Sequence, residues 1–375
     1  MAFPLPLWLA VQDELLRCEE DSGSGSGSGP GSGPRSCFDS FDDEALFELV
    51  HLNRPCAAFI TDAVRSHLQA DKSPLSVESM VLVALNYYAH GVLSTTALQK
   101  VGLNKTECLT TVVSTVSEVI AAMADQFISF PMTDDARCRV ASRTKDFCGI
   151  PNLLGILAPA HFKIRASPYE INAFRSFINC QGFTSVVSQI ICDCDGNILS
   201  VEKCCAGREN ELDMWEASLK QKEMEEGLHG SFRLIGGHSY YKSKHVLTPV
   251  LEPSSRGEYR FNAAHGKLHN VMLAAISEMK RRFECLMQLG FAHEGSLNKK
   301  SIIIKSCCVL HNIAKKFSVP SLPVAGEIFP QWTGKQYSLG EMNPEILKVR
   351  QEVIASNFSY CDSEWDRITT EEEEQ

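Results

Sequence analysis

The chain has 375 residues, of which 44% are hydrophobic, and its formal net charge is −10 at pH 7. This length and composition predict roughly two domains that bury a full hydrophobic core. The acidic balance excludes a protein that wraps nucleic acid with its whole surface.

The 15 cysteines do not form a recognisable metal or disulfide framework. The pairs Cys204–Cys205 and Cys307–Cys308 lie in apolar stretches, which is typical of buried thiols in a reducing compartment. Cys192 and Cys194 have no matching second pair, so no structural zinc site is expected. Without a basic leader or about twenty consecutive apolar residues, the protein is expected to be soluble and intracellular.

The first part of the chain predicts a disordered segment followed by helices. Residues 20–36 are a Gly/Ser linker that cannot bury apolar surface. Ser76 is predicted to cap a helix from Val77 to His90, with Gly91 as its end.

Two further helices are predicted next, a short one at residues 94–102 and a longer one after a capping pattern at Asn104 and Glu107. A short helix, a tight turn and a long helix are similar to a helix-turn-helix. Two interpretations stay open for the long helix. Its polar face offers one cation, Lys105, and no Arg, Asn or Gln for bidentate base contacts, so packing alone explains it well and DNA reading is the less favoured interpretation.

The second part switches to strands near Phe147–Pro151. The predicted order of strand, strand, strand, helix, strand, helix fits an α/β (α+β) fold in which a ribonuclease-H-like mixed sheet carries helices on its faces. The predicted elements are strands at 153–164, 184–192, 197–204 and 231–237, a turn at Asp195-Gly196, and helices at 210–226, 265–286 and 344–357.

At these segments the chain resembles the PIF/Harbinger transposases and the vertebrate Harbinger-derived nuclease family. The resemblance covers about residues 38 to 316. Its strongest markers are Cys308-Val309-Leu310-His311-Asn312-Ile313, Lys280-Arg281-Arg282-Phe283, Tyr259-Arg260-Phe261-Asn262 with His265, and the segment Cys192–Glu202.

The composition, the predicted elements and the resemblance together indicate four regions. They are a disordered N-terminus with the linker at 1–37, a helical, helix-turn-helix-like domain at 38–147, a ribonuclease-H-like transposase-derived domain at 148–318, and an acidic tail with a short helix at 319–375.

The resemblance also implies a catalytic triad of three carboxylates that hold two divalent cations for an in-line displacement on a phosphodiester. In this sequence the three family positions fall on Ala158, Gly237 and Leu273. All three carboxylates are replaced, so no catalytic residue, metal ligand or cofactor is expected.

Several neighbouring residues are candidates to replace the missing carboxylates. Glu278 is about 140° around the helix from Leu273 and is expected to point elsewhere. Asp193, Asp195 and Glu202 belong to a turn and to a different strand, and His161 and His238 alone make a poor Mg²⁺ site. The family's Gly-Ser-x-His-Asp pattern here reads Gly207 to Glu211, without the histidine. A divalent-metal nuclease that uses Mg²⁺ or Mn²⁺ therefore stays as the alternative function.

Charge is distributed unevenly along the chain. Residues 240–320 contain 13 Lys and Arg against 5 Asp and Glu, which suggests either a phosphate-binding face or a solvated helix surface. The candidate nucleic-acid-binding residues are Lys280, Arg281, Arg282, Lys299 and Lys300.

The favoured interpretation is a non-catalytic, transposase-derived interaction protein. The resemblance implies a location in the nucleus, with the cytoplasm as the second compartment, and a Myb/SANT-like nuclear protein and DNA as partners. A purely structural or self-associating protein remains a third hypothesis.

Overall fold

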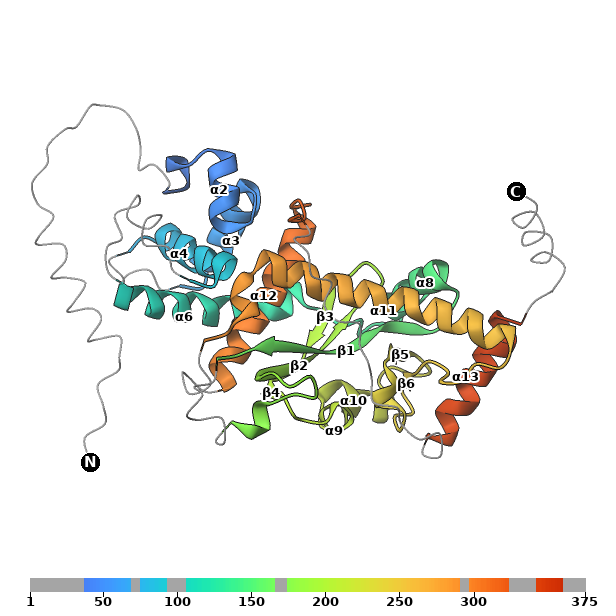
Figure 1. Ribbon diagram of the computed structural model, residues 1–375. Helices are drawn as coiled ribbons and strands as arrows, with labels where there is room; N and C mark the ends of the chain where they lie inside the picture. The colour runs from blue at the N-terminus through green and yellow to red at the C-terminus, as the bar shows by residue number, and fades with distance from the viewer. Residues whose placement is uncertain are drawn as a thin grey trace, which may run out of the picture.

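The computed structural model describes residues 37–68, 75–92, 106–165, 174–290, 297–323 and 342–359. A group of helices at one end of the molecule adjoins a mixed sheet that has helices on both faces (Figure 1). This architecture confirms the α/β (α+β) prediction, with a helical N-terminal part and a mixed-sheet core. No helix in the described ranges is long and apolar enough to span a bilayer.

The helical part agrees with the predicted caps wherever it is described. Its elements are η1 (Cys37–Ser40), α2 (Asp43–Val50), α3 (Arg54–Arg65), α4 (Val77–His90), α6 (Thr106–Ala122), α7 (Ala124–Phe127) and α8 (Asp134–Cys148). Ser76 caps α4 by accepting a bond from the Ser79 amide, and Gly91 ends the helix at φ 68°. The short helix at 94–102 and the turn before α6 lie outside the described residues.

Six strands form one sheet in the order β3-β2-β1-β5-β6, and β4 also pairs with β2. Strand β1 is antiparallel to β2 and parallel to β5, as the ribonuclease-H-like prediction requires. The strands are β1 (Leu153–Lys163), β2 (Ser185–Cys192), β3 (Ile198–Val201), β4 (Cys205–Ala206), β5 (Arg233–Gly236) and β6 (Val246–Leu247). The turn between β2 and β3 forms at Gly196, whose φ of 80° suits glycine.

Two predicted helices have different bounds in the structure. The helix predicted at 210–226 is divided into α9 (Glu211–Glu216) and α10 (Leu219–Glu225), because the Ser218 hydroxyl caps a new helix at the Gln221 amide. The helix predicted to begin at His265 begins nine residues earlier. Here α11 (Arg256–Arg282) starts with a reciprocal capping box between Ser255 and Glu258.

The sheet lies between two hydrophobic clusters. The larger cluster continues from the helical part through the α11 side of the sheet, and the smaller one lies under α9 and α10 around Trp215. Two later helices, α12 (Leu297–Lys316) and α13 (Pro344–Asn357), complete the fold, together with the short turns η4 (Arg175–Phe177), η5 (His238–Tyr240) and η6 (Glu284–Met287). The bounds of α13 are those predicted, and α13 packs on α11 and β6.

The segment Cys308–Ile313 has a structural role in α12. The Asn312 amide bonds the main chain of Ile198 in β3 through both its oxygen and its nitrogen, at 2.8 Å each, and its nitrogen also reaches the Phe127 carbonyl. His311 lies within 3.0 Å of the Gly196 carbonyl through Nε2. These two side chains therefore fix the β2–β3 hairpin and α7 to α12.

Arg282 joins three segments that are distant in the sequence. Its side chain is buried and donates to the carbonyls of His51, Val319 and Pro320 at 2.8 to 3.3 Å, and to the Glu278 carboxylate at 3.2 Å. The His51 ring in turn lies 2.9 Å from the Arg282 carbonyl. Since a buried cation needs such acceptors, Arg282 binds the helical part to the end of α11 and to the chain after α12.

We predict that Arg282→Met lowers the free energy of unfolding by about 3 kcal/mol. The buried carbonyls of His51 and Val319 and the part-buried carbonyl of Pro320 lose their donor, while the side-chain volume is nearly kept. Arg281→Met is the matched control, since Arg281 is half-buried and its Nη1 donates to the Ser277 hydroxyl one turn earlier on the same helix. Chemical denaturation measures both variants. Equal stabilities for the two would contradict the structural role assigned to Arg282.

Candidate functional site

The three vacated family positions meet in one small cavity of about 40 Å³. Ala158 comes from β1, Gly237 follows β5, and Leu273 lies on α11. The rest of the lining is Pro159, Glu211, Ser239, His269 and Ile276. The structure thus brings together the three positions that the resemblance implies for the triad, from the two strands and the helix expected.

Glu211 supplies a carboxylate to this cavity and was missed as a substitute by sequence reasoning. The Asn210 side chain caps α9 and directs Glu211 toward the sheet, where the Ser239 hydroxyl donates to its Oε2. The available signal was the spacing from Gly207, which puts Glu211 at the Asp of the Gly-Ser-x-His-Asp pattern.

The cavity residues do not fit a two-metal centre. Mg²⁺ and Mn²⁺ need several anionic oxygens, whereas Ala158, Gly237 and Leu273 offer a methyl group, a hydrogen and an isobutyl group. Glu211 already accepts the Ser239 hydroxyl, and burial lowers the pKa of His269, so the imidazole is neutral. Within the described ranges no three His, Cys, Asp or Glu side chains lie close enough to hold a metal ion.

The histidines near the vacated positions are held as neutral rings. Burial lowers the pKa of His161 to about 4 and also lowers that of His238. His265 is buried, its Nε2 lies 3.0 Å from the Gly236 carbonyl, and burial lowers its pKa to about 3. Because Gly236 precedes Gly237, His265 fixes the strand end that forms the cavity wall.

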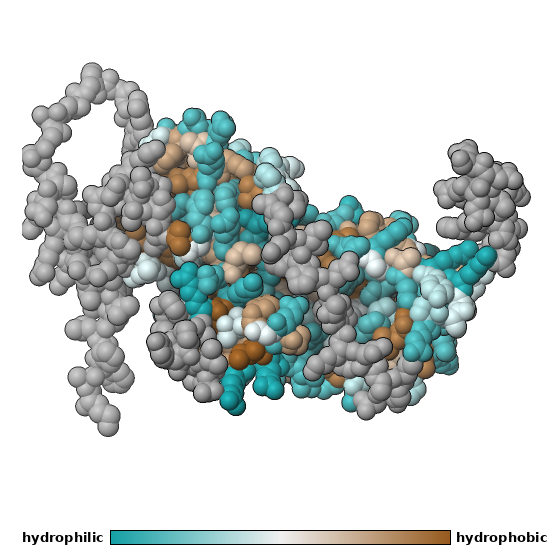
Figure 2. All heavy atoms as spheres, in the orientation of Figure 1, coloured by the Kyte–Doolittle hydropathy of each residue, from teal (hydrophilic) through white to brown (hydrophobic). Residues whose placement is uncertain are grey.

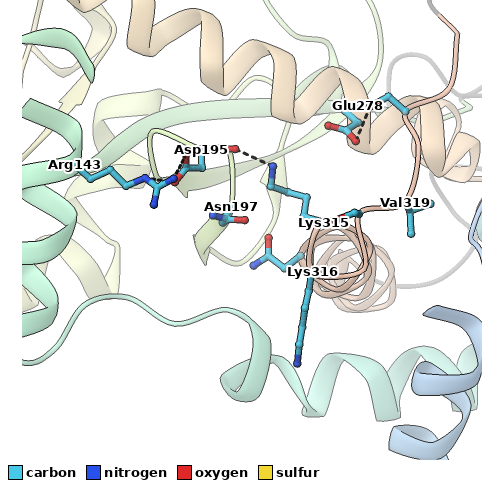
Figure 3. A pocket seen from close by; sticks show the side chains of 10 residues that line it. Arg143, Asp195, Asn197, Glu278, Lys315, Lys316 and Val319 are labelled. Atoms are coloured by element: carbon cyan, nitrogen blue, oxygen red, sulfur yellow. Dashed lines mark hydrogen bonds and ion pairs between the residues drawn. The ribbon is translucent and has the colours of Figure 1, made fainter. Parts of the chain in front are cut away.

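A larger, open pocket of about 640 Å³ lies between α8, the β2–β3 turn, α11 and the end of α12 (Figure 3). Asp195 and Glu278 both line it, although sequence reasoning did not predict that they share a pocket. As expected, Glu278 does not line the triad cavity. Arg143 holds Asp195 through Nε at 2.8 Å and Nη2 at 2.9 Å, and Arg282 holds Glu278. Both carboxylates are therefore neutralised by arginines, which disfavours a cation here.

The other acidic residues weighed as substitutes have local roles. Asp193 accepts the amides of Asp195 and Asn197 at 2.9 and 2.8 Å, which is an ordinary turn arrangement. Burial raises the pKa of Glu202, whose carboxylate lies near the Ser200 hydroxyl.

The five basic residues predicted to bind nucleic acid do not form one surface. Lys280, Arg282 and Lys300 are buried, and the Lys280 ammonium donates to the His161 carbonyl at 2.7 Å and lies 5.1 Å from the Phe162 ring centroid. Arg281 is half-buried and Lys299 is exposed. The expected face is wrong for the buried three, because Lys280 and Arg282 donate to carbonyls inside the protein and the Lys300 side chain is also buried.

Comparisons with known proteins show what this chain is similar to. Residues 160–312 match the family described as DDE superfamily endonuclease. The chain is 28% identical over 326 residues to "Putative nuclease HARBI1" of Mus musculus, and 27% identical to the Homo sapiens protein of that name; each match covers 86% of this chain and 92% of the relative. The Xenopus laevis protein is 26% identical over 324 residues, with the same coverage. No solved structure matches significantly.

We predict that the stability of this site falls as the pH is lowered from about 6.5 toward 4. The pKa of His265 is depressed in the folded state, so only the unfolded chain binds a proton there in this range, and the loss approaches about 1.4 kcal/mol per pH unit. His265→Gln should show a shallower loss over the same range, and His67→Gln, at an exposed position, should follow the wild type. Denaturant melts from pH 4 to 7.5 measure the slopes, and parallel curves for all three proteins would rule out this role for His265.

Proposed function

We propose that the chain is a transposase-derived protein that binds partners without cutting phosphodiesters, because residues 160–312 match the DDE superfamily endonuclease family and the cavity lacks the three carboxylates of that chemistry. The observation that supports this most is the meeting of Ala158, Gly237 and Leu273 in one cavity of about 40 Å³. That volume holds about one water molecule, far less than two hydrated cations and a phosphodiester require.

The energetics support the same proposal. Phosphodiester cleavage on this fold develops negative charge that bound cations stabilise, and loss of one such group commonly costs several kcal/mol of transition-state stabilisation. Here three such groups are absent together. Apolar replacements leave the hydrophobic cluster around β1 and α11 intact, so the fold persists without the reaction.

The competing function is residual metal-dependent cleavage, and one observation favours it. Glu211 supplies a carboxylate to the cavity, beside His269. A single carboxylate and one neutral imidazole hold a divalent cation weakly, and the hydrogen bond from Ser239 competes for the same oxygen. The non-catalytic role is therefore the better supported of the two.

We predict that the purified chain neither takes up Mn²⁺ at micromolar concentration nor nicks supercoiled DNA in Mg²⁺ or Mn²⁺. Isothermal titration and a nicking assay measure these two properties. Chelator-sensitive cleavage that disappears in Glu211→Gln would establish the competing nuclease function and overturn our proposal.

The triple variant Ala158→Asp/Gly237→Asp/Leu273→Glu should gain Mn²⁺ binding that the parent chain lacks. Gly237 has φ −68° and ψ 176°, a conformation open to any residue, so an aspartate there meets no backbone strain. The matched control replaces Leu273 with Gln in place of Glu, which keeps the added volume and removes the charge. Equal metal binding by the parent and the triple variant would show that the parent already has a site.

For the binding role itself, we propose a Myb/SANT-like nuclear protein as the partner, with the nucleus as the location. The similarity to transposase-derived relatives supports this proposal. Crosslinking and size-exclusion chromatography with a purified SANT-domain candidate test it, and a chain that only self-associates would support the third, structural hypothesis instead.

A further inference from the structure

Exposed cations gather at the end of β1, and they are different residues from the five that the sequence had suggested. Lys163 and Arg165 lie where β1 ends, Arg175 lies in η4, and Lys203 and Arg208 flank β4. All five are exposed, in a chain whose formal net charge is −10. Among the described residues of these segments, Glu209 is an exposed carboxylate beside Arg208, so the local balance remains strongly positive.

Main-chain hydrogen bonds hold these segments together. The Arg208 amide donates to the Ser176 carbonyl at 2.9 Å, and the Gly207 amide donates to the Ser185 carbonyl at 2.9 Å. A Cβ on Gly207 would collide with Ser185 and with the Phe177 carbonyl, so glycine permits this close approach. Arg208 is therefore adjacent to η4 and to the start of β2, just after the strand that follows Lys203.

Aromatic rings lie among the cations. The Lys163 ammonium is 5.2 Å from the centroid of the Phe183 ring, and the His161 ring meets the same phenyl edge-on at 6.5 Å. Phe174 and Phe177 form a second edge-on pair at 5.9 Å. Phe174 and Phe183 are half-exposed, and neither packs against the two hydrophobic clusters.

Figure 2 shows hydrophilic and hydrophobic residues side by side below β1 and β4 of Figure 1, at the lower end of the molecule. The cations and rings described above form a surface that we call the cation–aromatic rim. It consists of Lys163, Arg165, Phe174, Arg175, Phe183, Lys203 and Arg208.

We propose that the cation–aromatic rim binds single-stranded nucleic acid, with the cations on the phosphates and the phenyl rings stacked on bases. Cations alone would fit any polyanion, but half-exposed rings beside them favour unpaired bases, since every base offers a face for stacking and a duplex hides those faces. Deoxyribose and ribose strands share this chemistry. The inference rests on the proposed binding function and specifies its ligand.

The test uses the full chain and labelled 20-nucleotide oligo-dT, oligo-U and a 20-base-pair duplex, measured by fluorescence anisotropy at several salt concentrations. We expect both single strands to bind at least about tenfold more tightly than the duplex. The log–log salt slope should fall by about 1.4 in Lys203→Ala/Arg208→Ala, because each lost phosphate contact removes about 0.7 for single strands. A preference for dT or U would identify which sugar the rim accepts.

The stacking component has its own variants. Phe183→Ala should weaken single-strand binding by about 5- to 150-fold, and Phe183→Tyr, which keeps the ring, should retain it. Arg139→Ala/Lys145→Ala on α8 is the control, because both residues are exposed cations on a helix far from the rim (Figure 1). Thermal unfolding of every variant establishes that the fold is kept.

Four outcomes would overturn the inference: no binding at low salt, equal binding of duplex and single strands, full competition by polyglutamate, or the same loss in the α8 control. None of them would restore phosphodiester cleavage, so the proposed non-catalytic function would stand. Metal-dependent cutting of the oligonucleotides would instead overturn the proposed function, whatever the affinity of the rim.

Discussion

The arrangement of this protein depends on one buried guanidinium. Arg282 must find acceptors for its donors inside the protein, and it finds them on His51, Val319 and Pro320. Those acceptors belong to the helical part and to the chain after α12, so satisfying the cation also places both against α11. The continuous hydrophobic cluster across these parts reinforces the same placement, as does the Ser306 hydroxyl of α12, which donates to the Ser117 carbonyl of α6.

The cavity shows how the fold accommodates Ala158, Gly237 and Leu273 at the three positions where the resemblance implies carboxylates. Three carboxylates at these positions would repel one another unless cations lay between them. The apolar side chains Ala158 and Leu273 carry no charge and therefore need no counter-ion. Glu211 remains acceptable because the Ser239 hydroxyl donates to it. The sheet order, the position of β5 and the placement of α11 all persist around a cavity of about 40 Å³.

Local signals in the sequence predicted local structure well. Ser76 and Gly91 defined α4, Pro344 marked the start of α13, and the Asp195-Gly196 turn formed as expected. Tertiary contacts decided the rest. From composition alone, the basic run at residues 280–282 is typical of a solvated surface. Only the packing of α11 against β1 shows that the Lys280 side chain points inward and donates to the His161 carbonyl. Likewise, the position of Glu211 depends on how β4 and α9 fold back onto the sheet.

The junction of α6 with α12 makes the helical part and the sheet a single body in the described structure. Asn312 extends this junction to β3 and α7, so no flexible linker sets the separation between the two ends. Two domains joined by a flexible tether can change the distance between their binding surfaces when they meet a partner. Two domains that are packed against each other keep that distance fixed. Any partner that contacts both the outer helices and the far end of β1 must therefore match a distance that the packing of α6 on α12 fixes.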